Sequence, residues 1–222
     1  MNNDAMDLRA RNKQATREAI SHAALRLAIE QGPHGLALVR VHDIASAAGV
    51  SSRTYNNYFS SRAEAICAFQ ADQARRVGQA LRSRPADEPL GQAVIAAVIE
   101  IFTNPEPDKA GLRMIMSTPE LEGEALKAFT MAEGPLAEAI AARTGPDTGP
   151  DTGTGSHPGT HASAHSGRDL FAAVTAAAVA GAIRVAGRHW LGPGDTDSFG
   201  TTLSRALSCV FPAAPPEGPR ER

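Results

Sequence analysis

The stretch GVSSRTYNNYFSSRAEAI, residues 49–66, is rich in neutral hydrogen-bonding side chains and poor in apolar ones. Ser51 or Ser52 can accept the first backbone N–H groups of a helix, which is then expected to continue through Phe59. A second short helix is expected just before this stretch, over residues 41–48, where apolar residues recur on one face. Two short helices joined by a tight turn form a helix-turn-helix.

The polar composition of the second helix is suited to the major groove of DNA. Arginine can read guanine O6 and N7, and asparagine can read adenine N6 and N7, in each case with two hydrogen bonds. The second helix of a helix-turn-helix is the one that enters the groove. The alternative is an ordinary solvent-exposed helix with no binding role. It would explain neither why charged residues are so few nor why Gly49 and Val50 stand where the turn needs them. We therefore interpret residues 52–59 as a recognition helix.

Apolar residues recur at spacings of three and four along nearly the whole chain, and no alternating strand pattern persists. Ser61 and Glu64 have the spacing of a capping box, which predicts the start of a long helix. The expected fold class is all-α, with about nine helices at residues 11–31, 41–48, 51–59, 61–82, 89–102, 110–117, 119–142, 168–191 and 197–210.

These helices suggest two domains. Residues 1–62 are expected to form a three-helix DNA-binding domain, and residues 63–212 a larger helical domain for effector binding and dimerisation. Residues 213–222 are expected to be a disordered tail.

Residues 145–167 contain a duplicated GPDT unit and almost no apolar side chains, so a flexible loop is expected there. His157, His161 and His165 recur every fourth residue. Because Pro158 and Gly159 lie between them, a helical metal-binding face is not expected, and no metal site is predicted.

Composition narrows the class of protein. Hydrophobic residues make up 42% of the 222 residues and the net charge is −2, which is compatible with a sizeable core. Residues 1–62 carry eight Lys and Arg against five Asp and Glu, whereas residues 63–222 carry 14 against 19. A basic head on an acidic body suits a protein that docks one end on a polyanion, although a chance fluctuation of a few charges would look the same.

Several other classes are disfavoured. Cys67 and Cys209 form no disulfide framework and no zinc motif, and the N-terminus has no apolar signal region, so a cytoplasmic location is expected. The apolar run from Leu170 to Ile183 is shorter than the roughly 20 residues of a membrane span, and we interpret it as a buried helix. No catalytic motif such as GxSxG, HExxH or CxxC is present, so neither an enzyme nor a cofactor is predicted.

The segment HDIASAAGVSSRTYNNYFSSRAEAI, residues 42–66, resembles the DNA-binding domain of the TetR family of bacterial transcriptional repressors. The shared pattern is an Ile-Ala pair, a small residue before Gly-Val-Ser, Thr-Tyr, Tyr-Phe, and a basic residue that opens the next helix. The resemblance covers residues 11–66.

This resemblance implies which side chains touch DNA. Base edges would be read by Ser52, Arg53, Asn56 and Asn57. Phosphates would be held by Thr54, Tyr58 and Arg62. Tyr55 and Phe59 would point into the three-helix core. Arg40 departs from the family pattern, which has a capping Thr or Ser there; arginine cannot accept the N–H bonds of a cap, and we expect it to reach a phosphate instead.

The segment RMIMSTPELEGEALKAF, residues 113–129, together with the alanine-rich helix and the HWL, residues 189–191, that follow it, is similar to effector domains of mycofactocin-type regulators, which are associated with acyl-CoA-like ligands. The resemblance implies a small-molecule effector, hydrophobic or acyl-CoA-like. Candidate pocket residues are Phe102, Arg113, Met114, Met116, Phe129, Arg184 and Trp190. Methionine and aromatic residues at such spacings are also common in plain cores.

The alanine-rich helix at residues 168–191 and the final helix at residues 197–210 are candidates for a four-helix bundle between two subunits. The alternative is that they pack within one chain. Taken together, the sequence predicts a ligand-responsive repressor that binds a palindromic operator as a homodimer and is released by its effector. A constitutive DNA-binding or activator protein without a ligand is the alternative.

Overall fold

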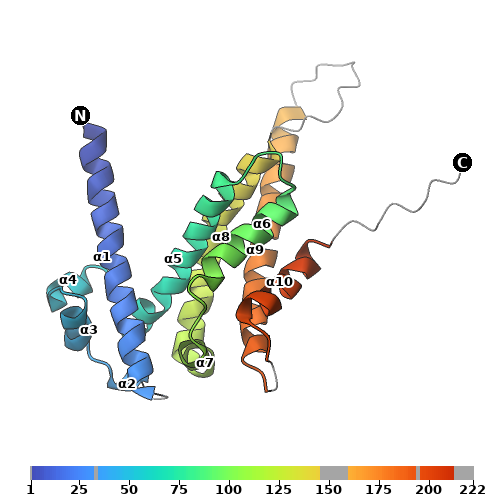
Figure 1. Cartoon of the computed structure of the whole chain (residues 1–222). Coiled ribbons are helices and arrows are strands. Elements are labelled where there is room, and N and C mark those ends of the chain that lie inside the picture. Colours follow the sequence, from blue (N-terminus) through green and yellow to red (C-terminus); the bar gives the residue numbers. More distant parts are fainter. Residues whose placement is uncertain (1, 33–34, 146–159, 194–195, 213–222) are drawn as a thin grey trace, which may run out of the picture. The chain divides into compact units, whose positions relative to one another are not determined.

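The computed structural model describes residues 2–32, 35–145, 160–193 and 196–212. These residues form ten α-helices and no β-strand, which confirms the all-α fold class. In chain order the helices are α1 (Asn2–Glu30), α2 (Gly35–Leu38), α3 (Val41–Ala47), α4 (Ser52–Asn56), α5 (Arg62–Ser83), α6 (Leu90–Thr103), α7 (Lys109–Ser117), α8 (Pro119–Thr144), α9 (Thr160–Trp190) and α10 (Phe199–Val210) (Figure 1).

Four helices, α1, α2, α4 and α9, differ from the prediction by three residues or more at one end or in their existence; the start of α9 is described below. The first helix starts at Asn2 instead of Arg11, because the intervening residues include neither glycine nor proline. The fourth helix ends at Asn56, three residues before the predicted Phe59. The short helix α2 was not predicted.

Close packing explains the glycine at the start of α2. A Cβ atom on Gly35 would lie 1.9 Å from the backbone carbonyl oxygen of Ala28, so only glycine lets this turn approach the end of α1.

The predicted loop at residues 145–167 is corrected at one end. Residues 160–167 belong to α9, because no proline follows Pro158 in this stretch and alanine and serine tolerate a helix. Residues 146–159, with His157, lie outside the described residues, and so do residues 213–222 of the predicted tail. Among the described residues, no group of three or more His, Cys, Asp or Glu side chains is placed to hold a metal ion.

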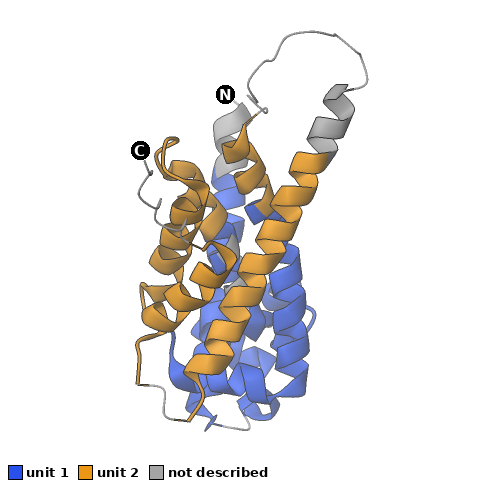
Figure 2. Cartoon of the chain, turned by 90° about the vertical axis from the view of Figure 1, so that its right-hand side faces the viewer, with its two compact units in different colours: residues 1–76, 107–136 blue, residues 77–106, 137–222 orange. Residues whose placement is uncertain are grey.

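The chain divides into two compact units (Figure 2). Unit 1 comprises residues 1–76 and 107–136, and unit 2 comprises residues 77–106 and 137–222. The predicted boundary after residue 62 lies inside unit 1, so the assignment of functions to residues 1–62 and 63–212 stays a prediction.

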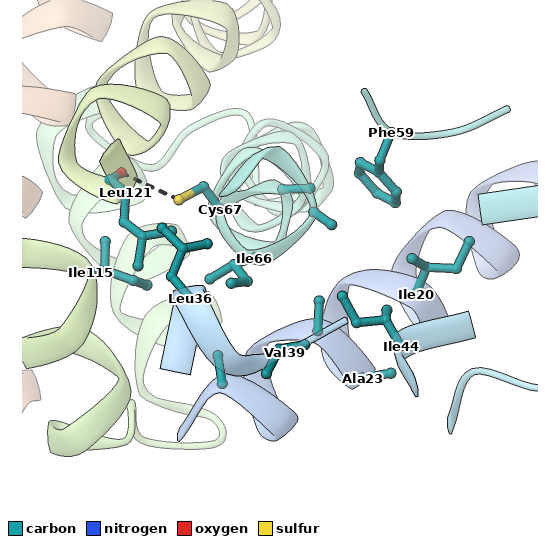
Figure 3. Packing of buried hydrophobic residues seen from close by; sticks show 14 of the residues in the cluster. Ile20, Ala23, Leu36, Val39, Ile44, Phe59, Ile66, Cys67, Ile115 and Leu121 are labelled. Carbon is teal, nitrogen blue, oxygen red and sulfur yellow. Dashed lines mark hydrogen bonds between the residues drawn. The ribbon is translucent and has the colours of Figure 1, made fainter. Parts of the chain in front are cut away.

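The core of unit 1 surrounds the buried face of α1 (Figure 3). Ile20, Ala24 and Ala28 on this helix are fully buried, as their spacing in the sequence predicts. Ile44 of α3 and Ile66 of α5 are equally buried in the same cluster. Each buried isoleucine contributes roughly 1.5–3 kcal/mol relative to an exposed one, so this cluster fixes how the short helices sit on α1.

In unit 2, α10 packs against α9 and α6. Phe199, Leu203 and Leu207 of α10 are buried inside this unit, so they belong to the chain's own core. The Trp190 indole N–H donates to the Asp197 carbonyl at 3.0 Å, which holds the connection between α9 and α10.

Arg143 of α8 closes the end of α5 in unit 2. Its guanidinium donates hydrogen bonds to four backbone carbonyl oxygens, those of Leu81 (3.4 Å), Arg84 (3.1 Å), Pro85 (2.6 Å) and Glu88 (2.8 Å). The last carbonyls of a helix have no partner within the helix, so this one side chain takes the place of a C-terminal cap.

Helix α9 is only partly buried. Its segment Gly167–Trp190 has 24 residues and a mean hydropathy of 1.8, so by length and composition it could span a membrane, and the prediction that the apolar run is too short was wrong. Of its apolar window, 44% is buried in the chain. The expected buried helix is therefore buried on one side, where Ala172, Ala176 and Val179 lie. Other large apolar side chains of α9 are exposed.

Candidate DNA-binding site

Helices α3 and α4 and the turn between them form the predicted helix-turn-helix (Figure 1). Gly49 in this turn has a φ of +69°, a conformation that costs a side-chain-bearing residue about 1–2 kcal/mol. The Gly49 N–H donates to the Ser46 carbonyl at 3.1 Å, and the Val50 N–H donates to the Ala45 carbonyl at 2.9 Å. These two bonds satisfy the end of α3 and reverse the chain into α4.

Ser51 caps the N-terminus of α4. Its hydroxyl oxygen accepts from the Thr54 backbone N–H at 3.0 Å and lies 2.9 Å from the Thr54 hydroxyl. Of the two serines predicted as possible caps, Ser51 is therefore the one used, and Ser52 is the first helical residue. The cap stabilises a helix of only five residues by about 1 kcal/mol.

One face of α4 presents polar side chains to solvent. Arg53, Asn56 and Asn57 are exposed, and their side chains make no hydrogen bond with any residue that the structure describes. Ser52, Thr54 and Tyr58 beside them are half-buried. Three of the four side chains predicted to read bases, those of Arg53, Asn56 and Asn57, are thus unengaged and accessible, as a groove-facing surface requires.

The opposite face of α4 is anchored in the core of unit 1. Tyr55 and Phe59 are buried, which confirms their predicted place, and their ring centroids are 5.8 Å apart. The Tyr55 hydroxyl donates to the Ser61 carbonyl at 3.0 Å. Burial above all, with the nearby Glu64 carboxylate, raises the pKa of Tyr55 to about 12, although the Arg62 charge opposes the shift. The hydroxyl therefore stays protonated and keeps donating this hydrogen bond.

Arg62 is the first residue of α5, and besides the phosphate contact predicted for it, the side chain binds backbone carbonyls within the chain. Its Nη1 donates to the Val39 carbonyl at 2.7 Å and to the Ala37 carbonyl at 3.3 Å, at the end of α2. The side chain thus holds the segment that leads into α3. Arginine carries five N–H donors, so Nε and Nη2 can still serve a phosphate, as the resemblance predicts.

Two further expectations concern helix starts. Arg40 occupies the N-cap position of α3 and makes no capping hydrogen bond with its side chain, which confirms that the usual hydroxyl cap is missing. Its side chain is exposed. At α5, Ser61 caps the Glu64 N–H at 3.0 Å as predicted. The Glu64 carboxylate, however, accepts from the backbone and hydroxyl of Ser60 instead of from Ser61.

Sequence reasoning missed Arg17 of α1. Its Nη1 donates to the Tyr58 carbonyl at 3.3 Å, and its guanidinium carbon lies 4.5 Å from the centroid of the Phe59 ring. Its position in the sequence could have indicated this role. Arg17 lies three residues before Ile20, so helical spacing places it on the same side of α1 as that buried residue.

Comparison with known proteins agrees with this geometry. The family model for bacterial regulatory proteins of the tetR family matches residues 20–65. The HTH-type transcriptional regulator TcmR of Streptomyces glaucescens is 31% identical over 220 residues, which cover 93% of this chain and 84% of TcmR. The chain belongs to the TetR family of transcriptional regulators.

Solved TetR-family structures share the fold. FadR of Thermus thermophilus, a transcriptional repressor crystallised with lauroyl-CoA, has a TM-score of 0.54 at 17% identity and covers 93% of this chain and 99% of its own. FadR of Bacillus halodurans, a fatty acid degradation regulator, has a TM-score of 0.52 at 15% identity, covering 93% and 97%.

The residues predicted for an effector pocket of this TetR-family chain divide between the units. Unit 1 contains Arg113, Met114, Met116 and Phe129, and unit 2 contains Phe102, Arg184 and Trp190. Met114 is part of the buried cluster of unit 1, and Trp190 lies with its ring 5.1 Å from that of Phe199. Phe102 is buried as well, Met116 and Phe129 are half-buried, and both arginines are exposed. The pocket itself stays a prediction.

Proposed function

We propose that this TetR-family chain is a repressor that binds a palindromic operator as a homodimer and is released by a small-molecule effector. The observation that carries the DNA-binding part is the division of α4 into two faces. Tyr55 of α4 and Phe59, three residues beyond its end, fix one face in the core. Arg53 and Asn56 of α4 and its C-cap Asn57 extend from the other face with unused hydrogen-bonding groups among the described residues. A helix held in this way can present a fixed pattern of donors and acceptors to base edges.

The other predicted contacts fit the flanks of such a helix. Ser52 completes the proposed base-reading set, and Thr54 and Tyr58 lie beside it as proposed phosphate contacts. Arg40 and Arg62, at the starts of α3 and α5, would bring positive charge to the phosphates on either side.

Support for the homodimer comes from the exposed side of α9. Leu170, Val174 and Val185 are 66%, 60% and 57% exposed, and their spacing places them on one stripe together with Gly181. An added Cβ on Gly181 would meet nothing within 4 Å, so packing inside the chain does not require this glycine. A second copy of α9 could therefore approach closely along this stripe and bury it.

For the effector, we propose a hydrophobic or acyl-CoA-like molecule, following the resemblance of residues 113–129 and 189–191 to mycofactocin-type regulators. The lauroyl-CoA bound by the structural neighbour from Thermus thermophilus is of the same chemical class. Such a ligand would act by binding the DNA-free state more tightly than the DNA-bound state. We further propose that the protein works in the cytoplasm, without enzymatic activity.

Substitution of one proposed base reader tests the DNA-binding part. The probe is a duplex that the wild-type protein selects from a randomised pool, compared with a scrambled duplex. Arg53→Ala should weaken binding to the selected duplex by roughly 1–3 kcal/mol and change binding to the scrambled one little, because the lost bonds are to bases. Equilibrium binding across a salt series measures both quantities.

Two further arginine variants complete the comparison. Arg62→Ala should weaken both duplexes alike and lower the slope of log K against log salt by about one, as a lost phosphate contact does. Arg82→Ala removes an exposed arginine outside the helix-turn-helix and should change neither duplex. Equal losses for Arg53→Ala on both duplexes would contradict the assignment of α4 as the base-reading element.

A further inference from the structure

The recognition helix α4 is too short to hold its own direction. It has five residues, Ser52–Asn56, and its single capping side chain is Ser51 at the N-terminal end. Isolated helices of this length are not stable in water, so the contacts of the residues around it determine how it is aimed.

Arg17 makes two of these contacts at the C-terminal end of α4. It donates a hydrogen bond to the Tyr58 carbonyl at 3.3 Å and stacks over the Phe59 ring at 4.5 Å. Tyr58 and Phe59 follow directly on the C-cap residue Asn57. A planar guanidinium can cover an aromatic face and donate from its edge at the same time, whereas the compact lysine ammonium cannot do both.

We propose that Arg17 is a positioning residue for operator recognition: from within unit 1, it sets the angle of α4 without touching DNA itself. The inference rests on the proposed function, because it assumes that α4 reads bases. A small tilt of α4 would misplace Arg53 and Asn56 together, and bidentate contacts to bases depend on direction as well as distance.

The test uses the full-length variants Arg17→Gln and Arg17→Lys, the duplex selected by the wild-type protein, and its scrambled control. Both variants should lose about tenfold in affinity for the selected duplex, equivalent to one hydrogen bond and one cation–π contact, and should change little on the scrambled one. The slope of log K against log salt should stay at the wild-type value for both, because no phosphate contact is removed.

Two results would overturn the proposal. If Arg17→Gln lowered the salt slope by about one and Arg17→Lys restored it, Arg17 would be a phosphate contact. If both variants kept the wild-type ratio of selected to scrambled affinity while their melting temperatures fell, Arg17 would serve folding alone.

Arg53→Ala, measured alongside, distinguishes a failure of the proposed function from a failure of this inference. If Arg53→Ala leaves the ratio of selected to scrambled affinity unchanged, the proposed function fails. If Arg53→Ala lowers that ratio and the Arg17 variants do not, only the role of Arg17 fails.

Discussion

The two cysteines of the chain lie in contrasting environments. Cys67 is 1% exposed on α5, and its Sγ donates to the Leu121 carbonyl at 3.3 Å (Figure 3). Burial, with a smaller contribution from Glu124, raises the pKa of Cys67 to about 12. Cys209 on α10 is exposed. Because the thiolate is the reactive form, the two thiols should differ strongly in reactivity.

We expect a thiol-specific disulfide reagent at pH 8 to modify one cysteine rapidly in the native protein and both after denaturation. At that pH only about one part in ten thousand of a thiol with a pKa near 12 is ionised. Absorbance of the released thiol counts the reacting groups. In Cys209→Ser the rapid phase should vanish; if it persisted, Cys67 would be accessible and the packing around it would differ from that described.

At the scale of single residues, roles that depend on local sequence could be predicted, and roles that depend on distant partners could not. The inward direction of Tyr55 and Phe59, which the resemblance of this stretch to the TetR family implies, is confirmed. The bonds from Arg17 to Tyr58 and from Arg62 to Val39 join residues far apart in the chain, so no local pattern indicates them.

Among the elements, the turn of the helix-turn-helix is the most sensitive to backbone conformation. Gly49→Ala should lower the free energy of unfolding by about 1–2 kcal/mol, because alanine is strained at a φ of +69° although the space around it is open. Denaturant titration followed by circular dichroism measures the change.

Gly123→Ala is the matched control. Gly123 lies in α8 with nothing within 4 Å of an added Cβ, and its φ is not positive. Alanine should therefore stabilise this helix by roughly 0.5–1 kcal/mol. A stabilising effect of Gly49→Ala would show that the turn does not hold the left-handed conformation in solution.

The helices could be predicted wherever apolar residues recur at helical spacing over several turns. Residues typical of helix caps and turns indicated where several helices begin or end. Ser51, Ser61 and Gly49 all act where the sequence predicts them. The short helix α2 has no periodicity to detect, since it depends on the close approach of Gly35 to Ala28. The start of α9 was missed because the low apolar content of residues 160–167 resembles that of the preceding loop.

For the whole molecule, the exposed stripe of α9 predicts an oligomeric state. Leu170→Glu should convert the proposed dimer to a monomer, because it would place a charge in an interface that excludes water. Light scattering after size-exclusion chromatography measures the mass directly. The Leu170→Glu monomer should also bind the proposed operator less tightly, since one molecule would no longer hold two half-sites at once.

Leu126→Glu provides the control for this change. Leu126 on α8 is 51% exposed, comparable to the 66% of Leu170, but it does not belong to the α9 stripe. The variant should keep the mass of the wild-type protein. A dimer that survived Leu170→Glu would place the contact between subunits elsewhere.

Arg143 illustrates how a genetic screen on this protein could mislead. Substitution of Arg143 would remove one hydrogen-bond donor from four backbone carbonyls around residues 81–88, and the carbonyls of Leu81 and Pro85 would keep only their backbone donors, the N–H groups of Arg84 and Glu88. If the protein is the repressor proposed above, such a mutant would appear among derepressed colonies together with mutants of the proposed effector site, yet its defect would be a low abundance of folded protein. We therefore expect the phenotype of substitutions at Arg143 to follow the amount of folded protein and not the proposed response to an effector.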